Sequence, residues 1–168
     1  MKNTKIISGF PGIGKSFLST EYKNLDIIDS DSSLFSWTIT DGTKVRNPDF
    51  PNNYLNHIVS NIGKVDVIMV SSHKDVRNIL NQNEIKAYLV YPDRSLKDEY
   101  VERYKLRNSD EKFIEFISNN WDNFMDELDA ENMIKIVLTS GQYLSDVFDD
   151  ILNGVAIVKS FIHHINQK

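Results

Sequence analysis

The chain from residue 9 to residue 16 reads GFPGIGKS, which satisfies in full the pattern G-x-x-x-x-G-K-S/T. An apolar run at residues 5–8 precedes this stretch and is predicted to be a strand, while residues 16–23 are predicted to be a helix. A strand, a glycine-rich turn and a helix in this order are the context in which the pattern forms a phosphate-binding loop. The stretch therefore predicts a nucleoside-triphosphate site near the N-terminus.

The residue types in this loop suit phosphate binding. Glycines let the backbone approach phosphate oxygens without an intervening Cβ, and N–H groups at a helix N-terminus attract anions. We expect Lys15 to reach the β- and γ-phosphates and Ser16 to ligate magnesium. The residues predicted to bind the nucleotide are Gly9, Pro11, Gly12, Ile13, Gly14, Lys15, Ser16 and Phe17.

Outside the loop, short apolar runs alternate with segments of helical periodicity. Further strands are predicted at residues 25–29, 65–71, 87–91 and 134–138, and further helices at 73–81, 95–107, 110–128 and about 142–164. Ser95, with Asp98 three residues later, has the spacing of a capping box for the 95–107 helix. Alternation of this kind predicts an α/β domain in which helices cover both faces of a parallel sheet.

Length and composition limit the classes of protein that the chain can represent. Its 168 residues fit one domain, and 19 Lys and Arg against 24 Asp and Glu give a net charge of −5, which disfavours a duplex DNA partner. The absence of cysteine excludes disulfides and thiolate zinc sites. The start is too polar for a signal peptide and no run has the roughly 18 apolar residues of a membrane span. We therefore expect a cytoplasmic protein without a membrane partner, either a monomer or a homodimer.

Acidic residues at the strand ends separate the classes of nucleotide-binding protein. A GTPase needs N-K-x-D and D-x-x-G signatures, and the chain contains neither. The 65–71 strand ends in serines, and its one acid, Asp66, lies near its start, so the acid that motor and AAA-type ATPases carry there is missing. The 25–29 strand ends instead in Asp29 and Asp31, which are predicted to lie beside Lys15 because parallel sheets bind ligands beyond the carboxyl ends of their strands. Asp29 with Ser16 is the predicted magnesium site, and Asp31 is a candidate to orient or deprotonate an acceptor.

The arginines gather in the middle of the chain, where cations for a transferred phosphoryl group are needed. All of them lie between residues 46 and 107, at Arg46, Arg77, Arg94, Arg103 and Arg107. Arg103 and Arg107 are one helical turn apart, although Arg103 is also placed to pair with Glu99 on the same helix. Residues 33–62 break the strand–helix alternation and carry aromatic side chains, which favours an ordered functional insert.

The order of these parts resembles that of the nucleotide-kinase group of P-loop proteins, which have the adenylate-kinase-like fold. The resemblance rests on the loop GFPGIGKS, the acidic strand end at residues 29–31, the insert, the arginine-bearing helix and the flanking strands. It implies a three-layer P-loop domain over residues 1–168, with a five-stranded parallel sheet in the order 2-3-1-4-5. It further implies that residues 33–62 bind the acceptor and that residues 95–109 form a lid.

The resemblance also implies roles for individual residues. Lys15, Asp29, Asp31, Arg103 and Arg107 would be catalytic, and the loop at 140–143 would lie near the adenine. The residues expected to bind the acceptor are Asp31, Phe35, Trp37, Arg46, Tyr54 and Arg77.

These observations favour an ATP- and magnesium-dependent kinase that acts on a small acceptor, foremost a nucleoside monophosphate or deoxynucleotide. The D-x-D at residues 29–31 also resembles shikimate-kinase-type enzymes, which phosphorylate a hydroxyl. A nucleoside, a metabolite or a nucleic-acid 5′ end is thus an alternative acceptor, with Asp31 as the base. A third alternative is a regulator that binds ATP without turning it over.

Overall fold

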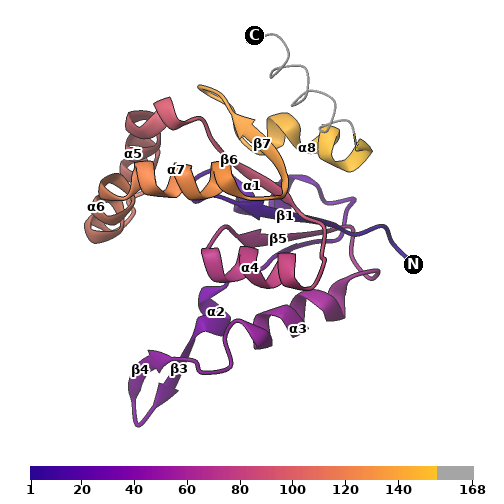
Figure 1. The fold of residues 1–168 in the computed structure, drawn as a ribbon. Helices are drawn as coiled ribbons and strands as arrows, with labels where there is room; N and C mark the ends of the chain where they lie inside the picture. Colours follow the sequence, from indigo (N-terminus) through magenta and orange to yellow (C-terminus); the bar gives the residue numbers. More distant parts are fainter. Residues whose placement is uncertain (155–168) are drawn as a thin grey trace.

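The fold is built on a sheet of five parallel strands with helices on both faces (Figure 1). The computed structural model of the chain describes residues 1–154. The strands of this sheet are β1 (Lys5–Gly9), β2 (Ile27–Asp29), β5 (Val67–Ser71), β6 (Tyr88–Pro92) and β7 (Ile134–Leu138). The helices around it are α1 (Lys15–Glu21), α3 (Asn52–Asn61), α4 (Lys74–Gln82), α5 (Lys97–Leu106), α6 (Glu111–Asn119), α7 (Trp121–Ala130) and α8 (Ser145–Asn153).

The strands lie side by side in the order β2-β5-β1-β6-β7. This strand order differs from the predicted order 2-3-1-4-5. The difference arises because β3 (Trp37–Thr40) and β4 (Thr43–Arg46) form a separate two-stranded sheet that was not predicted from the sequence. Counted along the chain without that hairpin, the five parallel strands lie as second, third, first, fourth and fifth. β1 is therefore central, and the turn that follows it lies in the middle of the carboxyl edge.

Alternate side chains of the central strands enter two cores, as the period of two in a strand requires. Val67 and Met69 of β5 contact the core under α1, α5, α7 and α8, whereas Ile68 and Val70 contact the core under α3 and α4. All four side chains are fully buried. The near-continuous apolar sequence of β5 is thus explained by helices on both of its faces.

The predicted helix at 110–128 is wrong as a single element, because the chain turns at Asn120 between α6 and α7. The side-chain amide of Asn120 donates to the Phe116 carbonyl over 2.8 Å and so competes with the helical backbone bond. The bend lets Trp121 pack edge-on against Phe10, with ring centroids 5.6 Å apart.

The predicted capping box at Ser95 is also wrong. Asp93 accepts hydrogen bonds from the N–H and the hydroxyl of Ser95, at 2.9 and 2.6 Å. These bonds lower the pKa of Asp93. They cap a short 3-10 turn, Arg94–Leu96, from which α5 continues.

The insert at residues 33–62 is ordered. It contains the short helix α2 (Ser33–Ser36), the β3–β4 hairpin and α3. The hairpin turn has Asp41 and Gly42 at positive φ, the conformation that Asp-Gly favours in two-residue hairpins. Figure 1 shows the hairpin projecting away from the sheet, while α3 packs beside α4 on one face of the sheet.

At the C-terminal end, α8 ends at Asn153, and Gly154 adopts a left-handed conformation that stops it. The predicted helix at 142–164 is therefore shorter at its start, and its part at residues 155–164 lies outside the described residues. Among residues 1–154, no helix is long and apolar enough to cross a membrane.

Candidate functional site

The turn between β1 and α1 takes a shape that depends on its glycines. Gly12 and Gly14 have φ values of +86° and +95°, which L side chains rarely adopt. A Cβ on Gly12 would lie 2.8 Å from the Tyr104 ring. The backbone can therefore pass under α5 only because residue 12 has no side chain.

Bonds from distant segments fix the turn in place. The Ile13 carbonyl accepts from the Leu144 N–H over 2.8 Å, and the Pro11 carbonyl accepts from the Tyr104 hydroxyl over 2.8 Å. Ile13 is fully buried. The turn is thus anchored on two sides, by α5 and by the segment before α8.

Lys15, the first residue of α1, folds back over this turn. Its Nζ donates to the carbonyls of Gly9 and Phe10, at 2.8 and 3.3 Å. Desolvation lowers the pKa of Lys15 to about 8; Asp29 opposes the shift, Arg107 adds to it, and Asp31 opposes it weakly. The ammonium group is therefore held among backbone carbonyls and gains stabilisation when an anion arrives.

The sequence predicts that this turn binds ATP, and the pKa of Lys15 predicts how that binding would depend on pH. Lys15 is charged below about pH 8 and neutral above it, so affinity for ATP should fall as the pH rises through about 8. The fall is at most about tenfold per pH unit, because neutral Lys15 takes up one proton when ATP binds. Titration calorimetry with ATP across this range measures it. In Lys15→Arg, whose guanidinium stays charged, this slope should vanish; an unchanged slope would assign the titration to another group.

Ser16 and Asp29 form the second part of the site. The Ser16 hydroxyl donates to Asp29 Oδ2 over 2.9 Å, which joins the start of α1 to the end of β2. A hydroxyl and a carboxylate oxygen are hard donors that suit Mg²⁺, which keeps most of its remaining ligands as water and phosphate oxygens. Among residues 1–154, no group of three or more His, Cys, Asp or Glu side chains could hold a metal ion.

Asp31 lies two residues beyond β2 and is exposed. Its Oδ1 accepts from the Ser33 N–H over 2.8 Å, at the start of α2. Its charge acts on Lys15 and also on the Tyr54 hydroxyl beneath the site. Asp31 thus stands between the glycine-rich turn and the insert.

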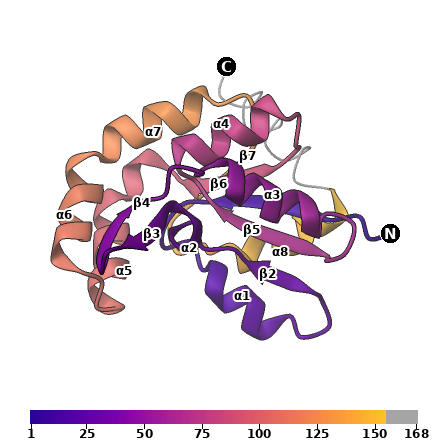
Figure 2. The same cartoon turned by 90° about the horizontal axis from the view of Figure 1, so that it is seen from below.

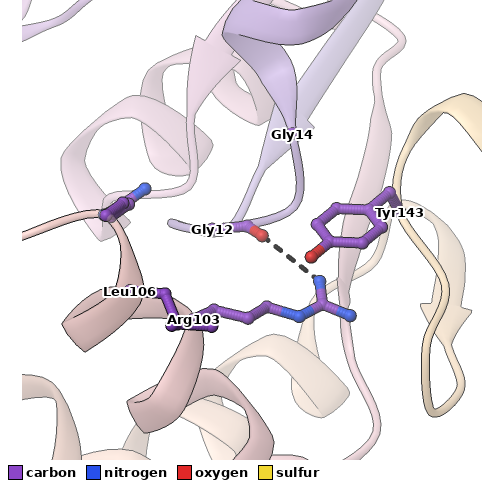
Figure 3. Close-up of a pocket in the computed structure, with 6 residues that line it drawn as sticks. Gly12, Gly14, Arg103, Leu106 and Tyr143 are labelled. Carbon is purple, nitrogen blue, oxygen red and sulfur yellow. Dashed lines mark hydrogen bonds between the residues drawn. The ribbon is translucent and has the colours of Figure 1, made fainter.

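A pocket of about 330 Å³ opens beside the turn. Figure 3 shows Arg103 reaching under Gly12 with the ring of Tyr143 beside its guanidinium. Arg103 lies 3.9 Å from the Tyr143 centroid and 4.5 Å from that of Tyr100. The pocket is lined by Gly12, Gly14, Arg103, Leu106, Arg107 and Tyr143.

The Arg103 guanidinium joins three segments. It donates to the Gly12 carbonyl at 3.3 Å, to the Gln142 carbonyl at 2.9 Å and to Glu99 Oε1 at 2.6 Å. Glu99 also accepts from Ser140 and Gly141. Although desolvation opposes the shift, these bonds hold the pKa of Glu99 below its usual value. Arg103 therefore holds the turn at Gly12 and the loop at Gln142 in place. Its donors are already occupied by groups of the protein.

We expect Arg103→Ala to lower the free energy of unfolding by about 1–3 kcal/mol, the cost of leaving buried polar partners unsatisfied. The side chain is only 10% exposed, so solvent replaces it poorly. Urea unfolding measures the change. Arg103→Lys should recover part of the loss at most, because a lysine lacks the planar fork and stacks less well. A midpoint that does not move would show that the three segments hold together without Arg103.

Arg107, one turn later, is held differently. Its guanidinium lies over the rings of Tyr104 and Phe113, 5.0 and 5.8 Å from their centroids, and its Nε donates to the Ser109 hydroxyl over 2.8 Å. It is exposed in the same pocket and its charge reaches Lys15. Of these two arginines, Arg103 on α5 and Arg107 at its C-terminal cap, Arg107 is thus the one with a guanidinium presented to the open side of the site.

On the insert side, Arg46 at the end of β4 lies between two aromatic rings. Its guanidinium is 5.5 Å from the Trp37 centroid and 4.9 Å from that of Phe50. A loose ion pair of 3.7 Å joins it to Asp75. Desolvation lowers the pKa of His73, and both Arg46 and Lys15 add to this effect. His73 therefore lies within electrostatic reach of both sides of the site.

Other predicted acceptor residues are engaged inside the protein. Tyr54 is fully buried, and its hydroxyl donates to the Ser30 carbonyl over 2.6 Å. Arg77 is 4% exposed and donates to Glu131 and Glu127 on the neighbouring α7 side. Phe35 packs against Tyr54, with centroids 5.0 Å apart. These side chains are placed to support the insert and α4, so we leave them out of the proposed acceptor contacts. Phe17, in contrast, is exposed on α1.

Sequence reasoning missed two partners that complete the site. Tyr143 covers Arg103 and packs on Gly14, yet only the family resemblance pointed to its loop. Lys44 lies over the Trp37 ring at 5.1 Å, and the signal available was its position two residues before Arg46 in a strand that alternates.

A scan against protein-family models finds no match to the chain, and a search of curated proteins finds none either.

Proposed function

We propose that this protein is an ATP- and magnesium-dependent kinase of the P-loop class that transfers the γ-phosphoryl group of ATP to a small acceptor. The foremost acceptor is a nucleoside monophosphate or deoxynucleotide. The observation that carries the proposal is the joint placement of Lys15 over the glycine turn and of the Ser16–Asp29 pair beside it. The sheet supports the same assignment, because its central strand leads into this turn.

In this mechanism, the backbone of residues 9–16 and the Lys15 ammonium hold the β- and γ-phosphates. An acceptor oxygen forms a bond to the γ-phosphorus, the bond from that phosphorus to the β,γ-bridging oxygen breaks, and ADP leaves. Arg107 stabilises the charge that develops on the migrating group, as cations do in phosphoryl transfer. Magnesium, held by Ser16 and Asp29, would supply further neutralisation of the phosphate charge.

The position of Asp31 favours a second candidate, transfer to a hydroxyl. The Asp31 carboxylate lies near enough to act on Lys15 and is exposed toward the insert. A hydroxyl acceptor must lose its proton as the bond to phosphorus forms, and Asp31 would take it. A phosphate acceptor is already ionised and needs no base.

Asp31→Asn separates the two acceptors. For a hydroxyl acceptor, we expect ADP release to fall by a factor of about 10²–10⁴, the contribution of a general base. For a nucleoside monophosphate, the fall should be well below that range. Asp41→Asn is the matched control, because Asp41 lies at the hairpin tip in a left-handed conformation that Asn also tolerates.

The proposal itself is tested by ADP release from magnesium-ATP with a panel of acceptors. The panel contains ribo- and deoxynucleoside monophosphates, nucleosides and shikimate-like hydroxyl compounds. Stimulation by one monophosphate class supports the leading acceptor, and stimulation only by hydroxyl compounds supports the second. ATP binding without stimulation by any acceptor would overturn the kinase and favour a regulator that uses ATP as a ligand.

A further inference from the structure

The β3–β4 hairpin is an exposed arm. All eight residues of its two strands are exposed, including Trp37 at 41% and Ile39 at 74%. Figure 1 shows the arm reaching beyond α2, and no other element within residues 1–154 packs on its far end. A short two-stranded sheet gains little stability by itself. Exposed aromatic and apolar side chains gathered on such a hairpin therefore favour an interaction site there.

One face of the hairpin alternates aromatic or apolar residues with cations across the two strands. Trp37 pairs with Arg46, and Ile39 pairs with Lys44, so all four side chains share a face. Lys44 Nζ lies 5.1 Å and the Arg46 guanidinium 5.5 Å from the Trp37 centroid. The two cations stand two residues apart on β4, a separation of about 7 Å.

The charge of this face is opposite to that of the chain. The chain carries a net charge of −5, yet neither hairpin strand contains an acidic residue. The pair between Arg46 and Asp75 spans 3.7 Å, and both side chains are more than half exposed, so it is weak. Lys44 and Arg46 therefore remain available to an anionic ligand that also offers flat rings to Trp37.

We infer that this face, Trp37, Ile39, Lys44 and Arg46, binds single-stranded nucleic acid. Bases stack on exposed aromatic side chains whatever their identity, and successive phosphates pair with cations beside them. Two cations along one strand suit a backbone with repeated phosphates better than a single nucleotide. A duplex would present its bases already stacked and leave Trp37 without a partner. The inference goes beyond the proposed function, because it concerns a ligand of the hairpin and requires no phosphoryl transfer.

The hairpin lies at the same end of the molecule as the candidate site. Figures 1 and 2 place the hairpin and α5 at the same end of the sheet, opposite the N-terminus. The charge of Arg46 reaches His73, which Lys15 also affects.

The chain provides its own optical probe for this binding. Its two tryptophans are Trp37, at 41% exposure, and Trp121, at 1%, so a ligand that stacks on the hairpin should quench the emission of the exposed one alone. The ligand tested is an oligothymidylate. An RNA of equivalent sequence, an abasic oligonucleotide of equal length and a duplex are titrated for comparison. We expect quenching and binding with the DNA or RNA single strand, and much weaker binding of the abasic strand and the duplex.

Variants locate the site. Trp37→Ala should lower the affinity for the single strand about 5- to 100-fold, measured by the anisotropy of a labelled strand. The double variant Lys44→Gln/Arg46→Gln should reduce the slope of log affinity against log salt by about 1.4, because two phosphate contacts are lost. Lys64→Gln, on the loop before β5, is the matched control and should bind as the unmodified protein does.

Lys15→Ala keeps this test separate from the kinase proposal, because it disables the glycine-rich turn and leaves the hairpin intact. Strand binding that persists in Lys15→Ala supports the hairpin site whether or not transfer occurs. The inference is overturned if neither DNA nor RNA strands bind. Equal binding by the abasic strand or by an acidic peptide of the same charge overturns it too, as does unchanged affinity in Trp37→Ala.

Discussion

Lys15→Ala is expected to lower acceptor-dependent ADP release by a factor of about 10²–10³, the typical cost of one preorganised charge-stabilising donor. Lys15 is the cation closest to the loop carbonyls, with its Nζ 2.8 Å from the Gly9 oxygen. Its desolvated position lowers its pKa, so the free protein gains little stability from the charge. Loss of the side chain should consequently weaken phosphate binding and leave the fold intact.

The matched control is Lys23→Ala, just beyond α1 and exposed. The control should keep full activity, and both variants should unfold at the urea concentration of the unmodified protein. Unimpaired ADP release by folded Lys15→Ala would remove the glycine-rich turn from the chemistry altogether.

Arg107→Ala is expected to lower kcat by a factor on the order of 10³, as removal of a charge-stabilising arginine does in phosphoryl transfer. The Arg107 guanidinium faces the pocket from above the rings of Tyr104 and Phe113. In the proposed mechanism it neutralises charge that develops as the phosphoryl group moves, so the KM for ATP should change much less than kcat. Steady-state kinetics of ADP release separates the two constants.

Lys105→Ala serves as the control for charge on the same helix, because Lys105 is exposed and pairs with Glu102. It should leave kcat unchanged. The comparison with Arg103→Ala is also informative, since that variant should lose stability, whereas Arg107→Ala should unfold normally. Equal losses of kcat in Lys105→Ala and Arg107→Ala would mean that only the general charge of α5 matters.

Local sequence was sufficient to predict the parallel sheet. Strand β5 reads VIMVS, and its side chains divide between two cores as a strand covered on both faces requires. The glycine-rich turn was equally predictable, since Gly12 and Gly14 adopt conformations that other residues avoid. The hairpin was missed although Asp41-Gly42 is a strong turn signal and WTIT alternates apolar and polar residues, because its two strands are only four residues long and exposed, so they lack the apolar runs that marked the other strands.

The break at Asn120 was hidden for a physical reason. Apolar residues keep a helical spacing through residues 113–128, so this spacing does not indicate that the chain turns at residue 120. The side-chain amide of Asn120 ends α6, and the packing of Trp121 on Phe10, far away in sequence, fixes the new direction. Contacts of this range override local propensity.

The sequence predicted that Ser16, Asp29 and Lys15 lie close together, because strand ends meet at one edge of a parallel sheet. In the structure the Ser16 hydroxyl donates to Asp29, and the charge of Asp29 acts on Lys15. It could not separate Arg103 from Arg107, which have equivalent positions on one helix. The difference lies in partners that are distant along the chain, the carbonyls of Gly12 and Gln142. Arg77 likewise carries the same charge in the sequence, but Glu127 on α7 and Glu131 just beyond it accept its hydrogen bonds.

The most direct test of the central claim follows the γ-phosphate itself. ATP labelled at the γ position is incubated with magnesium, the purified protein and a panel of nucleoside monophosphates, and the labelled product is identified by chromatography. We expect the label to appear in a nucleoside diphosphate, in step with ADP, and to be absent from that product with Lys15→Ala. Label found only in inorganic phosphate or left in bound ATP, with no acceptor modified, would contradict the assignment of this protein as a kinase.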